Sequence, residues 1–445
     1  MTSGVRMRAM LVTYVFPPTG GVGSERVRKL AKYLPEHGVE PIVLTAANPS
    51  VPLSDTSIAR DVRPDLRVLK ARTLEPGYAV KQAAWASSTS QGGARPPSLA
   101  TRVKGRLALL GRKVLIPDPQ VLWQPGVNLV LLQQLYRRTP AADLVFITAP
   151  PFSAFLAAPL ARLRRGTAVV LDYRDEWQTT RTSYEMIGGR LAAAIGNVME
   201  GLVLRCAHVV TTATEAFREN LLARFPFLQP ERVVAITNGY DPDDFPPALP
   251  EPPADRFLIT YAGTVYKLTS PRGFLAGVRL LHQREPELAR SLEVRFFGRI
   301  VDTERDAFEG MERLGVKVGG FIDKDQVALE QGAGHMTLCI QADVPGTERI
   351  YQAKLFELMY LGRPVLTLAP EGAMRRLVEA HQLGPILAPG DAEGIATYLA
   401  EALREWKAGR FSTRLAGVGL ERFHRRALAG EFAEVFRAAL ARARR

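Results

Sequence analysis

Cysteine and histidine are scarce in this chain, and their scarcity excludes several classes of protein. Two cysteines and six scattered histidines occur in 445 residues. Cys339 lies in an apolar stretch that predicts a buried strand, so a disulfide framework is excluded and a reducing, cytoplasmic environment is expected. The histidines and cysteines form no cluster with the spacing of metal ligands, and we expect no metal site.

Long apolar runs are also missing. No stretch approaches the roughly 18 uninterrupted apolar residues that cross a bilayer, and the first six residues lack the apolar core of a signal peptide. Acidic residues are outnumbered, which leaves a formal charge of +13. This excess favours anionic partners such as nucleotide-linked substrates or acidic lipids. Nucleic acid is not expected, because no recognisable module or aromatic-basic interleaving accompanies the charge.

The composition is that of a globular protein, with 47% apolar and 23% charged residues. The length suits two or three domains. Residues 8–15 predict a buried strand, and a glycine-rich loop then leads into a helix for which Ser24 is the expected N-cap. A second strand at 41–45 completes a βαβ unit. Glycines in its first turn allow backbone N–H groups to approach a phosphate. A dinucleotide fold would place an acidic residue after the second strand, and Thr45-Ala-Ala-Asn48 has none.

Residues 76–126 interrupt the alternation of strands and helices. Within them, residues 101–115 are basic and apolar without an acid. Such a segment suits an anionic membrane surface or a solvated helix packed on its own domain, and the sequence leaves both open.

The alternation then resumes, with strands at 143–148 and 168–171. The second strand delivers Asp172, Arg174 and Asp175 at its carboxyl end, where open α/β sheets bind ligands. A structural Asp–Arg pair is the other interpretation.

Residues 241–255 contain six prolines and predict a linker. A second series of strands and helices follows, and two of its strands end in Gly298-Arg299 and Gly319-Gly320. We therefore predict an α/β fold with two doubly wound, Rossmann-like domains facing a cleft. The N-terminal domain is expected over 1–240 with the irregular insertion at 76–126, and the C-terminal domain over 256–424, followed by a final helix at 425–445.

The stretch 351–366 predicts a short helix, a left-handed cap at Gly362 and a buried strand. Lys354 and Glu357 project from one face of that helix. A lysine can neutralise a phosphate and a carboxylate can accept bonds from both hydroxyls of a ribose. An internal surface ion pair is the alternative.

Five motifs, in this order, resemble the GT-B glycosyltransferases of family 4, within a subgroup carrying D-x-R-D-x-W and K-L-F-E that is often linked to cell-surface polysaccharide assembly. They are Phe16-Pro-Pro-Thr-Gly-Gly-Val-Gly-Ser-Glu25, Asp172-Tyr-Arg-Asp-Glu-Trp177, Thr237-Asn-Gly-Tyr-Asp-Pro-Asp-Asp-Phe245, Tyr261-Ala-Gly-Thr264 and Ala353-Lys-Leu-Phe-Glu-Leu-Met-Tyr-Leu-Gly-Arg-Pro-Val365.

The resemblance implies a metal-independent hexosyltransferase that needs no cofactor. Its substrates would be a nucleotide-sugar donor, expected to be UDP-linked, and a saccharide or lipid-linked acceptor, joined with retention at the anomeric carbon. It also implies that the last helix crosses back to the N-terminal domain. The place of a second family glutamate is taken by Arg349, with Glu348 beside it.

Carried over by position, the family's roles fall on named residues. Glu357 would bind the ribose and Lys267 and Lys354 the diphosphate, while Asp175 would orient or deprotonate the acceptor, with Arg174 holding nearby charge. The expected substrate-binding positions are Gly20, Gly21, Gly263, Thr264, Lys267, Arg299, Glu348, Arg349, Lys354 and Glu357.

Two other functions fit the same sequence. A UDP-sugar 2-epimerase would use the scaffold without an acceptor, although the predicted cleft offers few acidic and histidine groups. A non-enzymatic, membrane-associated binding protein is suggested by the basic segment 101–115. We expect the protein to be cytoplasmic. Peripheral attachment to the inner face of the membrane is compatible with that expectation.

Overall fold

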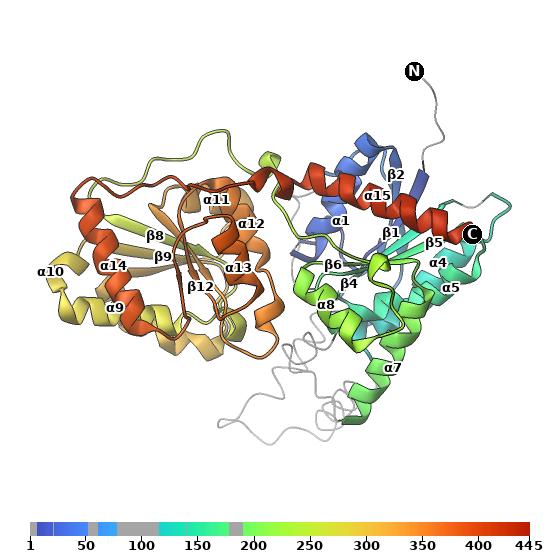
Figure 1. Ribbon diagram of the computed structural model, residues 1–445, viewed down its shortest axis with the longest axis horizontal. Helices are drawn as coiled ribbons and strands as arrows, with labels where there is room; N and C mark the ends of the chain where they lie inside the picture. The colour runs from blue at the N-terminus through green and yellow to red at the C-terminus, as the bar shows by residue number, and fades with distance from the viewer. Residues whose placement is uncertain (1–6, 21, 52–60, 78–114, 140, 178–189) are drawn as a thin grey trace. The chain divides into compact units, whose positions relative to one another are not determined.

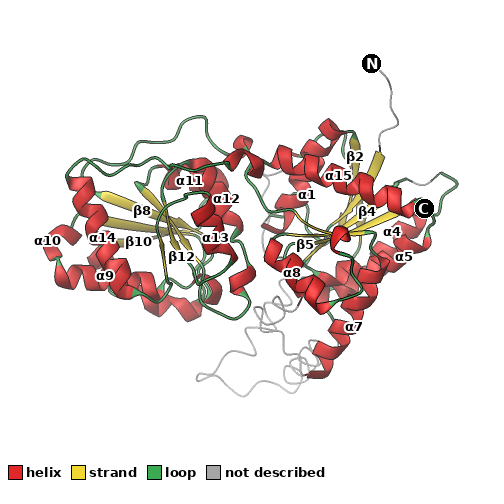
Figure 2. Ribbon diagram, in the orientation of Figure 1, coloured by secondary structure: helices red, strands yellow, loops and turns green. Residues whose placement is uncertain are grey.

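The computed structural model describes residues 7–20, 22–51, 61–77, 115–139, 141–177 and 190–445. The chain divides into two compact units. Unit 1 comprises Met1–Thr237 together with Arg425–Arg445, and unit 2 comprises Asn238–His424. Each unit is one parallel sheet with helices on both faces (Figures 1 and 2), which confirms the α/β fold class.

Unit 1 contains a seven-stranded sheet in the order β3-β2-β1-β4-β5-β6-β7. Its strands are β1 (Met7–Val12), β2 (Val39–Ala46), β3 (Arg67–Ala71), β4 (Leu144–Ala149), β5 (Ala168–Tyr173), β6 (Val209–Thr212) and β7 (Val233–Ala235). Its helices are α1 (Val22–Tyr33), α4 (Gln124–Leu135), α5 (Ala158–Leu163), α7 (Arg190–Cys206), α8 (Glu215–Arg224) and α15 (Arg425–Ala443).

The pleat of β1 separates the core of unit 1 into two layers. Met10 and Val12 lie in the cluster that includes residues of α4, α5 and α7, whereas Ala9 and Leu11 face α1 and α15. On that second side Phe432 and Phe436 of α15 pack on Phe146 of β4, with ring centroids 5.6 and 5.4 Å away. The final helix is therefore part of the unit 1 core.

One local prediction is wrong. Helix α1 begins at Val22, two residues before the expected N-cap, so Ser24 is an internal helical residue and is fully buried. The turn that follows β1 therefore ends earlier along the chain than the position of Ser24 suggested.

Unit 2 contains a six-stranded sheet in the order β10-β9-β8-β11-β12-β13. Its strands are β8 (Phe257–Ala262), β9 (Leu292–Phe297), β10 (Val316–Gly320), β11 (Met336–Ile340), β12 (Val365–Leu368) and β13 (Ile386–Leu387). Its helices are α9 (Arg272–Arg284), α10 (Pro286–Ala289), α11 (Lys324–Gly332), α12 (Ala353–Leu361), α13 (Ala373–Ala380) and α14 (Ala392–Lys407). Gly362 closes α12 with a φ of 67°, which confirms the left-handed cap, and Cys339 is buried in β11 as expected.

Both sheets have a point where the order of strands reverses. It lies between β1 and β4 in unit 1 and between β8 and β11 in unit 2. The loops that leave the carboxyl ends of these strands diverge to opposite faces, which opens a crevice at the edge of a doubly wound sheet. Each unit therefore has one favoured place for a ligand.

Candidate active site

On the β8 side of the unit 2 switch point, the loops that follow β8 and β9 are joined to each other and to the end of β10. The N–H of Gly263 donates to the Phe297 carbonyl at 2.8 Å, and the N–H of Gly298 donates to the Gly320 carbonyl at 2.6 Å. Gly298 has a φ of +114°, and a Cβ there would lie 2.3 Å from the Gly263 carbonyl oxygen. This close approach of backbone to backbone requires glycine at position 298.

Lys354 reaches this edge from the first turn of α12. Its ammonium donates to the carbonyl of Ala262, the last residue of β8, and a Cβ on Gly263 would lie 2.6 Å from Nζ. Burial lowers the pKa of Lys354, while the nearby Glu357 opposes that shift. The switch point of unit 2 therefore holds a fixed cation beside bare backbone.

Glu357 lies one turn further along α12, with 35% of its side chain exposed, and its Oε1 is 3.9 Å from Nζ of Lys324. Lys324 also contacts Asp244 at 3.0 Å. The residues of the K-x-x-E pair thus have different partners, Ala262 for the lysine and Lys324 for the glutamate. Sequence reasoning missed Lys324 and Asp244, although Asp244 belongs to a motif noted above.

The other expected donor residues lie in three loops, which follow β8, β9 and β11. Glu348 accepts from the Gly346 N–H at 2.7 Å and pairs with Arg349, so both belong to one short turn after β11. Thr264 and Lys267 follow β8 and are exposed. Arg299 is also exposed, and its carbonyl accepts from the Val265 N–H at 2.8 Å, which ties the loops after β8 and β9 together.

In unit 1, Arg174 forms hydrogen bonds to the backbone on both sides of the switch point. Its guanidinium donates to the carbonyls of Gly23 at 2.8 Å, of Ala149 at 3.3 Å and of Pro150. These carbonyls belong to the start of α1 and to the end of β4. Arg174 therefore holds the two sides of the switch point together, which points to a positioning role.

The two aspartates beside Arg174 differ in their surroundings. Asp172 is fully buried and accepts from Thr148 at 2.7 Å, from Thr211 at 2.8 Å and from Arg26 at 3.3 Å, so it is a structural residue. No residue that the structure describes hydrogen-bonds to the side chain of Asp175. Burial raises the pKa of Asp175, and the Arg174 and Arg26 guanidiniums oppose this shift. Asp175 is therefore a carboxyl group with a raised pKa next to two guanidiniums.

A second acidic group near this edge, Asp118, was missed because it lies within the irregular insertion 76–126. Burial raises the pKa of Asp118 from 3.8 to about 6, although the Ser153 N–H donates to its Oδ2 at 2.9 Å. Close by, the Tyr14 hydroxyl donates to Glu75 at 2.6 Å. Tyr14 follows β1 and Ser153 follows β4, so these groups also belong to the switch point.

Three predictions concern residues of the glycine-rich loop and the basic segment. Gly20 is buried at the end of the loop after β1, whereas Gly21 and residues 101–114 lie outside the described residues.

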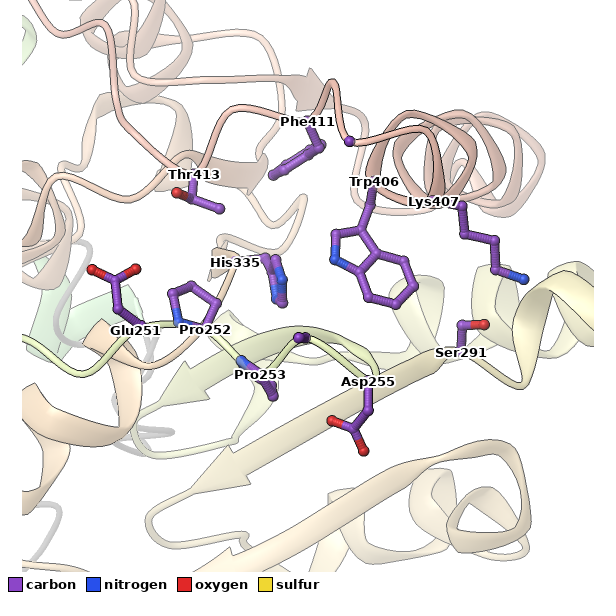
Figure 3. Close-up of a pocket in the computed structure, with 12 residues that line it drawn as sticks. Glu251, Pro252, Pro253, Asp255, Ser291, His335, Trp406, Lys407, Phe411 and Thr413 are labelled. Carbon is purple, nitrogen blue, oxygen red and sulfur yellow. The ribbon is translucent and has the colours of Figure 1, made fainter.

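A groove of about 650 Å³ in unit 2 is separate from these residues (Figure 3). It is lined by Asp255, Ser291 and His335, which precede β8, β9 and β11, and by Trp406 and Phe411. Its strand residues lie at the amino ends of the sheet. The groove is therefore at the edge opposite Gly263 and Lys354 and does not belong to the candidate site.

Comparisons with known proteins agree with the architecture described above. Residues 20–239 match the family model of the glycosyl transferase 4-like domain. A search of curated protein sequences gives no match. Among the residues described, no helix combines the length and apolar character needed to cross a membrane.

Solved structures resemble the chain over nearly its whole length. Sucrose-phosphate synthase from Thermosynechococcus elongatus has a TM-score of 0.61 at 16% identity, covering 98% of this chain and 100% of that one. Anabaena HepE in complex with UDP and glucose has a TM-score of 0.59 at 15% identity, covering 96% and 98%. A putative UDP-N-acetylglucosamine 2-epimerase from Listeria monocytogenes has a TM-score of 0.50 at 13% identity, covering 96% and 94%.

Proposed function

We propose that the protein transfers a hexose from a UDP-sugar to a hydroxyl acceptor, on the premise that residues 20–239 match the glycosyl transferase 4-like domain and that the whole chain has the GT-B fold. We further propose that it does so with retention, without a metal ion, and in the assembly of a surface polysaccharide or glycoconjugate. HepE, which shares the fold, forms a complex with UDP and glucose, and this supports the choice of donor.

The observation that carries the proposal is Lys354 at the switch point of unit 2. A nucleoside diphosphate gains negative charge as the sugar departs, and a positioned cation at a partly dry edge stabilises that charge. Gly263 and Gly298 carry no side chains of their own beside Lys354, so a diphosphate could approach backbone as well as the ammonium there. Lys267, Arg299 and Arg349 would supply further positive charge around the same loops.

Unit 1 would hold the acceptor. Asp175 combines burial with a raised pKa, so near neutral pH it is better matched to taking a proton from a hydroxyl than an ordinary aspartate. Arg174 would keep the surrounding backbone in place through its bonds to Gly23, Ala149 and Pro150.

A UDP-sugar 2-epimerase is the second candidate, because a putative enzyme of that kind shares the fold. Incubation with UDP-sugars alone separates the two functions. An epimerase converts the sugar without an acceptor, whereas the proposed transferase releases UDP only when a saccharide or lipid-linked hydroxyl is added. Isomerised sugar in the absence of an acceptor would overturn the transferase proposal.

Glu357 provides the test of the donor site. Replacing Glu357 with Ala removes the carboxylate proposed to bind both ribose hydroxyls, and we expect UDP affinity to fall about ten- to hundred-fold, as for hydrogen bonds to a charged group. Glu287→Ala is the control, because Glu287 is an exposed glutamate in α10 of the same unit. Isothermal titration with UDP measures both variants. Unchanged affinity in Glu357→Ala would remove this residue from the site.

A further inference from the structure

Two helices of unit 1 expose apolar side chains at helical spacing. On α4 these are Leu129 and Leu132, with Tyr136 directly after the helix, and on α7 they are Ile195, Val198 and Leu202. Leu129 is 57% exposed and Val198 is 63% exposed. In each helix the residues are three and four apart, so they share one side of the helix.

Helix α5 lies between these two helices and continues the same surface. It packs against both α4 and α7, and Figure 1 shows the three next to one another on unit 1. The Tyr136 hydroxyl of α4 donates to Leu160 of α5 at 3.1 Å, and Leu163 at the end of α5 is 74% exposed. The exposed side of α4, α5 and α7 is referred to below as the leucine face.

Four arginines lie next to the leucine face. Arg137 and Arg138 follow α4, and Arg162 and Arg165 lie at the end of α5; all four are exposed. Among the described residues, none of the four pairs with a carboxylate. Glu200 is the acid of α7, but it is fully buried and paired with Arg224 at 2.5 Å.

Two exposed arginines of unit 2 serve as a comparison. Arg290 pairs with Glu287 at 2.8 Å and Arg305 with Asp302 at 2.9 Å. Unlike these two, the four arginines of the leucine face have no carboxylate partner among the described residues. A surface that combines exposed apolar side chains with unpaired arginines is complementary to a lipid bilayer that contains acidic lipids, because such a bilayer has an apolar interior and an anionic surface.

We propose that the leucine face docks on an anionic lipid bilayer, with the leucines in the interfacial region and the arginines against the headgroups. A second copy of the chain fits less well. A twofold interface would place this face against itself, and the four arginines would meet arginines without an intervening exposed acid from α4, α5 or α7. The proposal is independent of the transferase reaction and of the segment 101–115.

Vesicle sedimentation with the full chain tests the proposal. The wild type should bind vesicles of phosphatidylcholine mixed with phosphatidylglycerol and should bind pure phosphatidylcholine much more weakly. Arg137→Gln with Arg138→Gln should weaken binding to the anionic vesicles about ten- to thirty-fold, at about 1 kcal/mol for each basic residue. Leu129→Ser with Leu132→Ser should weaken it about ten-fold.

Matched controls remove the same groups from unit 2. Arg290→Gln with Arg305→Gln causes the same change in net charge, and Val318→Ser with Val418→Ser removes two apolar side chains that are 49% and 52% exposed. Both controls should bind like the wild type. Circular dichroism and a thermal melt verify that each variant is folded.

Three outcomes would overturn the proposal. The wild type could fail to prefer anionic vesicles. Binding could depend only on the segment 101–115, seen as loss in Arg102→Gln with Lys104→Gln and Arg106→Gln while the leucine-face variants bind normally. Sedimentation velocity could show a wild-type dimer that Leu129→Ser with Leu132→Ser dissociates, which would assign the face to a second copy.

Discussion

The switch points of the two sheets have the same topology and different chemistry. In unit 2, Lys354 lies beside glycine backbone and its ammonium donates to the strand end at Ala262. In unit 1, Arg174 donates to three backbone carbonyls, and Asp175 and Asp118 near this edge both have raised pKa values. One edge therefore suits an anionic ligand and the other suits proton transfer from a neutral one. Each sheet has a switch point of the same topology, and the side chains at the two switch points favour the different roles proposed above.

Asp175→Asn gives the strongest test of the task proposed for unit 1. If Asp175 is the base, kcat should fall about 10²- to 10⁴-fold with little change in the KM for the donor. The acidic limb of the wild-type pH–rate profile should lie above the ordinary pKa of an aspartate, because burial raises the pKa of Asp175, and this limb should disappear in the variant. Steady-state kinetics across pH provides both readouts. A variant with the wild-type profile would show that the two edges do not divide the reaction in this way.

Lys354→Met is the corresponding change in unit 2. Loss of the cation beside the departing diphosphate should lower kcat/KM about 10²- to 10³-fold. Lys407→Met is the control, because Lys407 lines the groove at the opposite edge of the same sheet. UDP release assays should show a large effect for the first variant and almost none for the second. Equal effects would indicate that Lys354 acts through general charge rather than position.

Gly298→Ala tests whether bare backbone matters at the unit 2 edge. The added Cβ would meet the Gly263 carbonyl oxygen at 2.3 Å, and φ is +114°. We expect a loss of about 2–4 kcal/mol in the free energy of unfolding, combining overpacking with backbone strain. Gly310→Ala separates the two causes, because Gly310 has a φ of +73° and nothing within 4 Å of the added Cβ. Chemical denaturation should show a clearly smaller loss for Gly310→Ala.

Asp118→Asn tests the buried acid of unit 1 and has the smallest expected effect. The folded state raises the pKa of Asp118 from 3.8 to about 6, so it binds the proton more tightly than the unfolded chain. This contribution to stability is fully present below about pH 4 and is lost as pH rises through about 6, by about 3 kcal/mol at most. Asparagine can still accept from the Ser153 N–H but does not titrate. The difference in Tm between wild type and variant should therefore shift in favour of the variant as pH rises from 4 to 7. A constant difference would contradict the raised pKa.

Sequence patterns predicted the regular parts of the molecule because the determinants are local. Apolar runs of strand length and the cap at Gly362 both carry their signal within a few residues. The position of Lys354 on the first turn of α12 could be predicted in the same way.

Contacts between distant residues could not be predicted. The partner of Lys354 is Ala262, 92 positions earlier, and the partners of Arg174 lie 24 to 151 positions away. Lys324 was missed because it is the first residue of an otherwise ordinary helix, and only the fold brings it to Asp244 and Glu357. At Ser24 a local signal was misleading. Serine is a good capping residue, but the helix begins before it, so Ser24 lies inside α1.

The place of α15 has a consequence for how the protein is made. Unit 1 contains the first 237 residues and the last 21, so the ribosome releases all of unit 2 before the helix that covers Phe146 exists. Until α15 is made, only α1 and its neighbours cover that side of the first sheet, and a nascent or truncated chain presents the rest of this apolar side to chaperones and proteases. Unit 1 is begun before unit 2 and completed after it.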